Sequence, residues 1–385
     1  MGSARTTTGA IAAAAMALAV TAPMATAGAS HHPHDDGDTL RTVVDDLHGP
    51  RGVDALGHGL TLVTENDGTF SLVIEKGHRY GHHRYSEPKE IQLGQVPADF
   101  APAIAAGRHG TVWLLTGATD NEDVIGGAAK LYKWRPGWDE PVVFADIAAY
   151  QKTDPDPYDL EDFPEDSNPF GLAALRDGSV LVSDAAGNDL LHVFKDGSIE
   201  TVARLKPREV TVPEGLEGAG TQVMAEAVAT SVTVGKDGSW YVGELRGFPG
   251  TAGTSEIWRV RPGTTDATCD PEHPWGECKR YADGLTSIVD LGAGYRGVYA
   301  VTLSKLTWLA IESPEPVPGA EIGGLFLVSR GHHHGWGHRG HGHDARITEL
   351  VPDQLVLPGG VDVDDRGTPY VVGPVFGDGS LYKIR

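Results

Sequence analysis

The sequence predicts an all-β fold, a six-bladed β-propeller in which the N-terminal strand closes the last blade. Three observations support this prediction. Gly 51 and Pro 25 in 385 residues, with 40% hydrophobic residues, favour many short strands joined by turns around a real core. A unit of short apolar runs separated by glycine-containing turns recurs six times. The last unit ends after its third strand, whereas a strand-like segment precedes the first unit.

The clearest unit is 168–197, NPFGLAALRDGSVLVSDAAGNDLLHVFKDG. Its three apolar runs end at Asp-Gly, Ala-Gly-Asn and Asp-Gly, which predicts three antiparallel strands joined by tight turns. The following segment, 199–205, has the same β-branched character and supplies a fourth strand. A sheet of this size cannot bury both faces alone, so neighbouring copies are expected to cover it.

Five further copies flank this unit along the chain. They occupy 49–77, 100–137, 228–263, 284–331 with a long insertion, and 357–385. The first five units are each followed by a candidate outer strand, namely KEIQL, PVVFADI, IETVARL, CKRYADGL and ITELVPDQL. The segment LRTVVDDL at 40–47 resembles these outer strands. It is expected to complete the sixth blade and to remove the free edges of an open array.

The N-terminal 27 residues read as a signal peptide. They carry a single charge, Arg5, then an alanine-rich apolar run, then Ala25-Thr26-Ala27, a small-x-small cleavage pattern. Residues 28–39 are predicted to be a flexible segment and residues 40–385 a single propeller domain. No later stretch is long enough to span a membrane. We therefore expect a secreted, extracellular protein without a membrane span.

Charge and cysteine content narrow the partners and the compartment. The net charge of -22 becomes -23 without Arg5, which disfavours nucleic acid and anionic membranes because both need a basic surface. The two cysteines, Cys269 and Cys278, are expected to form a disulfide that pins a long hairpin loop in an oxidising compartment. A free thiol or a ligand pair is the alternative.

Acids and amides gather on one face of the predicted propeller, the face with the loops between second and third strands and between blades. Carboxylate and amide oxygens that converge near the channel suit Ca²⁺, and Asn168, Asp184 and Glu244 are the candidate ligands. The alternative is that these residues only cap turns. The predicted ligand-binding residues are Glu65, Asn66, Asn168, Asp184, Asn188 and Glu244.

Two further loops carry unusual composition. The loop 154–169 contains seven acids and no base, so it either attracts a cationic ligand or metal or is a solvated surface loop. A glycine-rich loop in blade five carries six histidines, a composition that binds Zn²⁺ or Cu²⁺ adventitiously or as a buffer more readily than as a catalytic centre. These histidines are His332, His333, His334, His338, His341 and His343.

Motifs of known catalytic sites are missing from the sequence: it has no nucleophile elbow, no H-E-x-x-H and no phosphate-binding glycine loop. This favours a non-catalytic ligand-binding or scaffold protein whose partner is a small molecule, an ion or an extracellular protein. Two alternatives remain, a metal-dependent hydrolase, lactonase or lyase that uses the channel, and divalent-metal binding by the histidine-rich loops.

The units quoted above, together with TSVTVGKDGSWYVGELRGFPGTAGTSEIWRV and LPGGVDVDDRGTPYVVG, resemble the ScyD/ScyE family of secreted bacterial proteins. The resemblance covers the mature chain and implies an NHL-like propeller. More distantly, the sequence is similar to the gluconolactonase/senescence-marker superfamily, which implies a divalent ion in the channel. Asn168 and Asp184 match ligand positions of that superfamily, whereas His48 stands where a glutamate is expected.

Overall fold

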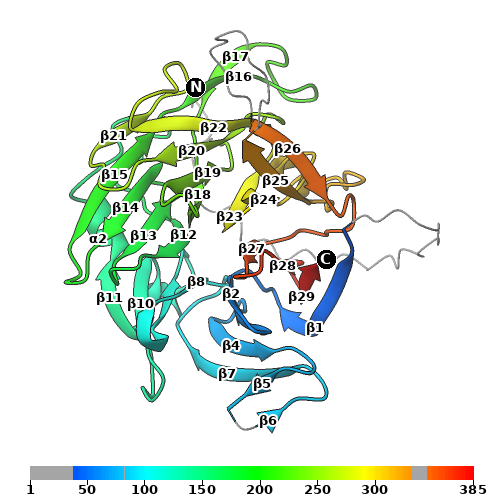
Figure 1. Cartoon of the computed structure of the whole chain (residues 1–385). Coiled ribbons are helices and arrows are strands. Elements are labelled where there is room, and N and C mark those ends of the chain that lie inside the picture. The colour runs from blue at the N-terminus through cyan, green and yellow to red at the C-terminus, as the bar shows by residue number, and fades with distance from the viewer. Residues whose placement is uncertain (1–37, 82, 331–344) are drawn as a thin grey trace, which may run out of the picture.

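The computed structural model describes residues 38–81, 83–330 and 345–385. Within these ranges, six sheets of four or five strands, antiparallel except at the outer edge of the five-stranded sheet, are arranged around a central axis, as Figure 1 shows. The prediction of an all-β, six-bladed propeller is confirmed. Only two short α-helices interrupt the described strands, α2 (Ile147–Gln151) and α3 (Trp308–Ile311).

In each of the first three blades the strands follow chain order from the innermost to the outermost, and in blade 1 a small hairpin comes between the third and fourth strands. Blade 1 contains β2 (Val53–Gly57), β3 (Leu60–Thr64), β4 (Thr69–Ile74) and β7 (Lys89–Gln95). Blade 2 contains β8 (Ala103–Ala106), β9 (Val112–Leu115), β10 (Lys130–Trp134) and β11 (Val142–Asp146). Blade 3 contains β12 (Pro169–Ala174), β13 (Val180–Asp184), β14 (Asp189–Val193) and β15 (Ile199–Leu205).

The other three blades follow the same plan, except that the last one takes its outer strand from the other end of the chain. Blade 4 contains β18 (Ala229–Val234), β19 (Trp240–Glu244), β20 (Ser255–Val260) and β22 (Cys278–Leu285). Blade 5 contains β23 (Ile288–Gly294), β24 (Gly297–Thr302), β25 (Gly324–Arg330) and β26 (Ala345–Leu350). Blade 6 contains β27 (Gly360–Val363), β28 (Pro369–Gly373), β29 (Asp378–Ile384) and β1 (Leu40–His48).

The N-terminal strand closes the ring as predicted. β1 pairs antiparallel with β29, with Leu40 opposite Ile384 and His48 opposite Asp378. Figure 1 shows the blue strand β1 beside the red C-terminal strand. The closure satisfies the outer backbone groups of β29 and leaves the sixth blade with four strands like its neighbours.

The core lies between the blades. Six apolar clusters occupy the six interfaces between neighbouring sheets, because the strands place valine, leucine and tryptophan on the faces that meet. Between blades 3 and 4, for example, Leu181 and Val232 pack near the fully buried Trp258. Each sheet therefore depends on both neighbours for burial of its faces.

Glycines at the start of innermost strands let the blades approach closely at the axis. A Cβ atom on Gly360 would lie 2.0 Å from the carbonyl oxygen of Arg51 in the next blade, and one on Gly171 would lie 2.6 Å from Cα of Ser231. Neither position accommodates a side chain. The glycines of the repeated first strands thus set the narrow spacing of the ring.

The disulfide between Cys269 and Cys278 is confirmed. It does more than pin a hairpin loop, because strand β21 (Ala267–Cys269) leaves its own blade and pairs in parallel with β15 of blade 3. Cys278 begins β22, the outer strand of blade 4. The bond therefore links the edges of two neighbouring blades.

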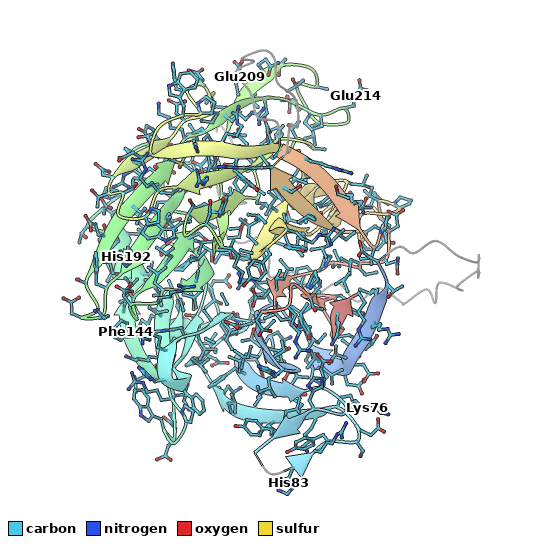
Figure 2. The ribbon with its side chains drawn as sticks, in the orientation of Figure 1. Lys76, His83, Phe144, His192, Glu209 and Glu214 are labelled. Atoms are coloured by element: carbon cyan, nitrogen blue, oxygen red, sulfur yellow. A yellow bond between two sulfur atoms is a disulfide. The ribbon has the colours of Figure 1, made fainter. Side chains whose placement is uncertain are left out.

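Two small hairpins lie outside the six blades. In the first, β5 (Arg79–Tyr80) pairs with β6 (His83–Arg84), and in the second, β16 (Arg208–Thr211) pairs with β17 (Gln222–Ala225). The second lies at the rim of the molecule, where Figure 2 labels Glu209 and Glu214. None of the helices in the described part of the chain has the length and apolarity needed to cross a membrane. The predicted signal peptide and the six histidines of blade 5 lie outside the described residues.

The antiparallel order sorts the loops onto two faces of the ring. We call one the interblade face, which carries the loops between second and third strands and the loops between blades. The opposite face carries the loops between first and second and between third and fourth strands.

Candidate functional site

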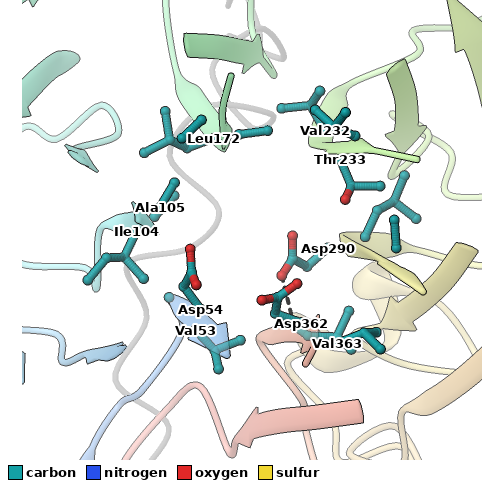
Figure 3. Close-up of a pocket in the computed structure, with 18 of the residues that line it drawn as sticks. Val53, Asp54, Ile104, Ala105, Leu172, Val232, Thr233, Asp290, Asp362 and Val363 are labelled. Carbon is teal, nitrogen blue, oxygen red and sulfur yellow. Dashed lines mark hydrogen bonds between the residues drawn. The ribbon is translucent and has the colours of Figure 1, made fainter. Parts of the chain in front are cut away.

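A cavity of about 250 Å³ lies on the central axis, surrounded by the innermost strands of all six blades (Figure 3). One side of its wall carries three aspartates, Asp54 of blade 1, Asp290 of blade 5 and Asp362 of blade 6, whose carboxylates Figure 3 shows directed into the cavity. The side formed by blades 2 to 4 is mostly apolar, and includes Ala105, Leu172, Ala173, Val232 and Thr233. The cavity is therefore two-sided, acidic on one wall and mainly hydrocarbon on the other.

Each aspartate is held by the neighbouring blade, because one of its oxygens accepts a backbone N–H from the next innermost strand. The three hydrogen bonds run to Asp54 from Ala106 (2.6 Å), to Asp290 from Val361 (2.8 Å) and to Asp362 from Ala55 (2.8 Å). These bonds form a chain that crosses from blade 5 through blades 6 and 1 to blade 2. They orient the carboxylates before any ligand arrives.

The carboxylates of the cavity hold protons more tightly than exposed aspartates do. Burial raises the pKa of Asp290 to about 6, although the backbone N–H of Val361 and the charge of Arg51 oppose the shift. Burial also raises the pKa of Asp54, and the pKa of Asp362 is raised well above its ordinary value by burial and then by the charge of Asp54. A cation in the cavity would favour the ionised carboxylates and would displace protons.

Arg51 fills the axis at the end of the cavity nearest the interblade face. Its guanidinium group lies 3.6 Å from the ring centroid of Phe170 and donates hydrogen bonds to the carbonyl oxygens of Ala101 (3.2 Å) and Phe170. Phe100 and Phe376 pack around the same point, with ring centroids 6.4 Å apart. Burial lowers the pKa of Arg51 to about 10, so it stays charged at neutral pH. From Arg51 and these aromatic rings, the cavity extends toward Lys236 on the opposite face.

The structure brings together two of the predicted ligands, Asn168 and Asp184. Asp184 is fully buried and accepts the backbone N–H of Asn168 (2.7 Å) and the hydroxyl of Ser167 (2.6 Å). It also accepts the N–H groups of Ala186 and Gly187, both at 3.1 Å. The Asn168 side chain in turn accepts the backbone N–H of Ala118. In these contacts the two residues hold the start of β12 against the loop after β13.

Glu244 has a separate set of partners inside blade 4. Its carboxylate pairs with the buried Arg246 and accepts the indole N–H of Trp258 (3.3 Å) and the backbone N–H of Glu256 (3.0 Å). Arg246 also contacts the carboxylate of Glu256 at 3.2 Å. The partners of Glu244 are thus distinct from those of Asn168 and Asp184, and a shared Ca²⁺ ion stays a prediction.

The other predicted ligand-binding residues lie in loops of the interblade face. Glu65 accepts the backbone N–H of His48 (2.7 Å), and the backbone N–H of Asn66 donates to the carbonyl oxygen of His48 (2.9 Å). Asn188 is buried with φ 49°, a left-handed conformation that asparagine tolerates. Its amide nitrogen donates to Asp156 (3.0 Å) and Glu226 (3.2 Å), so it joins two loops.

A possible metal-binding group lies in the disulfide loop rather than in the channel. Among the described residues, one set of three His, Cys, Asp or Glu side chains has all its ligand atoms within 4.8 Å of one another. This set consists of Asp270, Glu272 and His273. Asp270 is already paired with Lys206 at 2.8 Å. The histidines predicted to bind Zn²⁺ or Cu²⁺ lie outside the described residues.

The sequence reasoning missed the three cavity aspartates. The signal that identifies them is a Val-Asp pair in the first strand of three repeats, at Asp54, Asp290 and Asp362. A charged residue in an innermost strand is exceptional, because that strand faces either a neighbouring blade or the axis. Comparison of the first strands of the six repeats would therefore have singled out these three aspartates as residues that face the axis.

Comparison with known proteins supports the fold. No protein-family model matches the chain, and no curated protein matches it either. Among solved structures, the PQQ-bound aldose sugar dehydrogenase of Streptomyces coelicolor aligns with a TM-score of 0.51 and 12% identity, covering 91% of this chain and 99% of the other. A putative oxidoreductase (glucose dehydrogenase) of Thermus thermophilus aligns with a TM-score of 0.51 and 15% identity, and the alignment covers 91% of this chain and 100% of the other.

A third structure, described as a glucose dehydrogenase, aligns with a TM-score of 0.52 and 14% identity, covering 90% of this chain and 99% of the other. These neighbours are six-bladed propellers, and at such low identity the likeness concerns the fold alone. The resemblance to the ScyD/ScyE family stays a prediction.

Proposed function

We propose that this chain is a secreted, non-catalytic binding protein that holds a small organic cation in its central cavity. The observation that carries the proposal is the set of three oriented carboxylates, Asp54, Asp290 and Asp362, on one wall of a cavity of about 250 Å³. The disulfide supports an oxidising compartment, in keeping with the predicted signal peptide.

The spacing of the carboxylates favours an organic cation over a single metal ion. Among the described residues, the carboxylate oxygens of Asp54, Asp290 and Asp362 do not all lie within 4.8 Å of one another, so as placed they are not a preformed set of ligands for one ion. Amino groups on a short carbon chain are able to reach separate carboxylates. The chain itself would lie against the apolar wall formed by Leu172 and Val232.

A metal-dependent hydrolase, lactonase or lyase is the alternative. It requires Asn168, Asp184 and Glu244 to act on one ion, and the separate hydrogen-bond partners of Glu244 favour binding over this catalysis. Metal-dependent turnover of lactones or esters that Asp184→Ala abolishes would establish the enzyme instead. Metal binding by the histidine-rich loop is tested by Zn²⁺ titration of a variant that lacks residues 331–343.

Calorimetric titration with linear diamines and polyamines tests the proposal, with diols of the same length as neutral controls. We expect amines to bind and Asp290→Asn or Asp362→Asn to weaken binding at least tenfold, about 1.4 kcal/mol. Asp139→Asn, an exposed carboxylate on the opposite face, is the matched control and should leave affinity unchanged.

The same titration has a predicted pH dependence. Because the pKa of Asp290 is about 6 in the free protein, affinity for amines should rise between pH 5 and 8 as the carboxylates ionise. Binding at pH 6 should release protons, seen as a dependence of the heat on the ionisation enthalpy of the buffer. If no amine binds, or if the cavity variants bind as well as the wild-type protein, the proposal is wrong.

A further inference from the structure

Negative charge is concentrated on the interblade face. The loops that emerge there contain 21 Asp and Glu residues and six Lys and Arg residues. Two of the six bases are buried: Arg51 donates hydrogen bonds to backbone carbonyl oxygens, and Arg246 is paired with Glu244. The described loops of the opposite face contain 13 acids and 11 bases and are nearly balanced. The molecule is therefore strongly polarised along the propeller axis.

The same face exposes large apolar side chains. Phe163 of the acidic loop is 50% exposed and Phe248 of the loop after β19 is 56% exposed. Other exposed apolar residues on these loops are Ile125, Leu160, Leu306 and Val356. Apolar groups scattered among acids on one face are typical of a surface that contacts another molecule.

A small pocket of about 60 Å³ lies on this face beside the acidic loop. Its apolar lining comes from Phe170, Ala185, Val228 and Leu245, and no Lys, Arg or His is among the described residues that line it. The carboxylates that line it are Asp159, Glu161, Asp166 and Glu226.

Within the described part of the chain, no Lys, Arg or His forms an ion pair with a carboxylate of the pocket. Glu226 is 9% exposed and accepts hydrogen bonds only from neutral groups, the backbone N–H of Leu160 (2.7 Å) and the amide of Asn188 (3.2 Å). Burial raises its pKa to about 7, and the charges of Glu161 and Asp159 add to the shift. The pocket thus has a negative potential that a cation from outside would relieve.

We propose that the interblade face is a docking surface for a basic extracellular polypeptide, and that this pocket receives a Lys or Arg side chain of that partner. The methylene groups of the side chain would pack on Phe170, Val228 and Leu245. Its charged end would lie among Glu161, Asp166 and Glu226. This division of one side chain between an apolar and a charged environment is the usual preference of Lys and Arg.

Other occupants fit this face less well. A second copy of the chain would oppose one strongly acidic face to another. A bare divalent ion lacks a preformed set of ligands here, because the one such group among the described residues lies in the disulfide loop. The proposed surface is also separate from the central cavity, since Arg51 and Phe100 fill the axis between them.

Two peptides of equal charge test the pocket. The first is a labelled ten-residue oligolysine, and the second has ornithine at every position, whose side chain is one methylene shorter and whose amine stays protonated at neutral pH. We expect the lysine peptide to bind at least tenfold more tightly, because only its side chains reach the carboxylates across the apolar floor. Equal affinities would mean that only the diffuse field attracts the peptides, and would overturn the pocket assignment.

Charge-neutralising variants locate the surface. The double variant Glu161→Gln/Asp166→Asn should weaken oligolysine binding at least tenfold, and Phe163→Ser should weaken it as well. The control Asp139→Asn/Glu140→Gln removes the same charge from the opposite face and should change affinity less than twofold. Equal losses in both double variants would refute the proposal, and so would peptide-independent self-association through this face in sedimentation experiments.

Peptide binding at the interblade face should be independent of diamine binding in the central cavity. Binding of small diamines should be unchanged in Glu161→Gln/Asp166→Asn, and oligolysine binding should be unchanged in Asp290→Asn. Unfolding curves of the variants establish that each is folded, so that a loss of binding is assigned to the surface.

Discussion

At the residue scale, buried carboxylates in this propeller serve to join parts of the chain. Asp184 accepts four hydrogen bonds at the start of β12, and Glu226 connects the acidic loop to Asn188. The three cavity aspartates link neighbouring blades in the same way. Each of the three bonds to a cavity aspartate satisfies a backbone N–H near the axis.

Glu226 gives a pH-dependent prediction at this scale. Its pKa is raised to about 7 in the folded protein, so its contribution to stability is complete at low pH and is lost as the pH rises through 7. Glu226→Gln does not ionise. Relative to wild type, the variant should gain about 2–3 kcal/mol of unfolding free energy between pH 5 and pH 8.

Urea unfolding of both proteins at the two pH values measures this difference. The substitution also alters hydrogen bonds of residue 226. Their effect on the unfolding free energy is taken to be the same at pH 5 and pH 8, so it cancels when the two pH values are compared. A constant difference between variant and wild type would show that Glu226 does not titrate in this range.

At the element scale, β21 acts as a strap between blades. It belongs by sequence to the connection between β20 and β22 but pairs with β15 of blade 3, and the bond from Cys269 to Cys278 returns it to blade 4. Both cysteines are buried. The strap therefore reinforces one blade interface at its outer edge, far from the axis.

Removing the disulfide should loosen this strap selectively. Cys269→Ala/Cys278→Ala should lower the free energy of unfolding by about 2–3 kcal/mol, the loop entropy expected for a closed loop of about ten residues. Hydrogen exchange should accelerate in β21 and change little in β3 and β4 of blade 1, which serve as the internal control. Uniform acceleration in all blades would contradict a local role.

At the scale of the whole molecule, the ring has two levels of organisation. Apolar clusters fill every interface between blades, so the sheets are stable only as a closed set. Over this ring, charge is distributed unequally between the faces. The cavity and the interblade face are thereby distinct sites on one scaffold, divided by Arg51.

Ring closure by β1 should be essential for stability. A chain that begins at Gly49 lacks β1, leaves β29 as a free edge and exposes the interface that Leu47 fills. We expect the melting temperature to fall by more than about 10 °C relative to a chain that begins at Asp38. A peptide of residues 38–48 should restore much of this loss, and an unchanged melting temperature without the peptide would contradict the role of β1.

The sequence by itself determined the number of blades, the strand positions, the closing strand and the disulfide. These features follow from local patterns, since turns and apolar alternation repeat within each unit and chain order then defines the ring. Only the tertiary structure decided which side chains meet. Asp54 and Asp362 lie far apart in sequence but face one cavity, and β21 pairs with a neighbouring blade.

The candidate site shows the physical reason for this limit. Local patterns placed Asn168, Asp184 and Glu244 correctly at the ends of strands. They do not reveal which hydrogen-bond donors each side chain already contacts in the folded protein. Arg246 lies two residues from Glu244 and pairs with it because the chain turns back on itself after β19. Convergence of side chains depends on the angles between blades and on competition for hydrogen bonds, and both are properties of the folded ring.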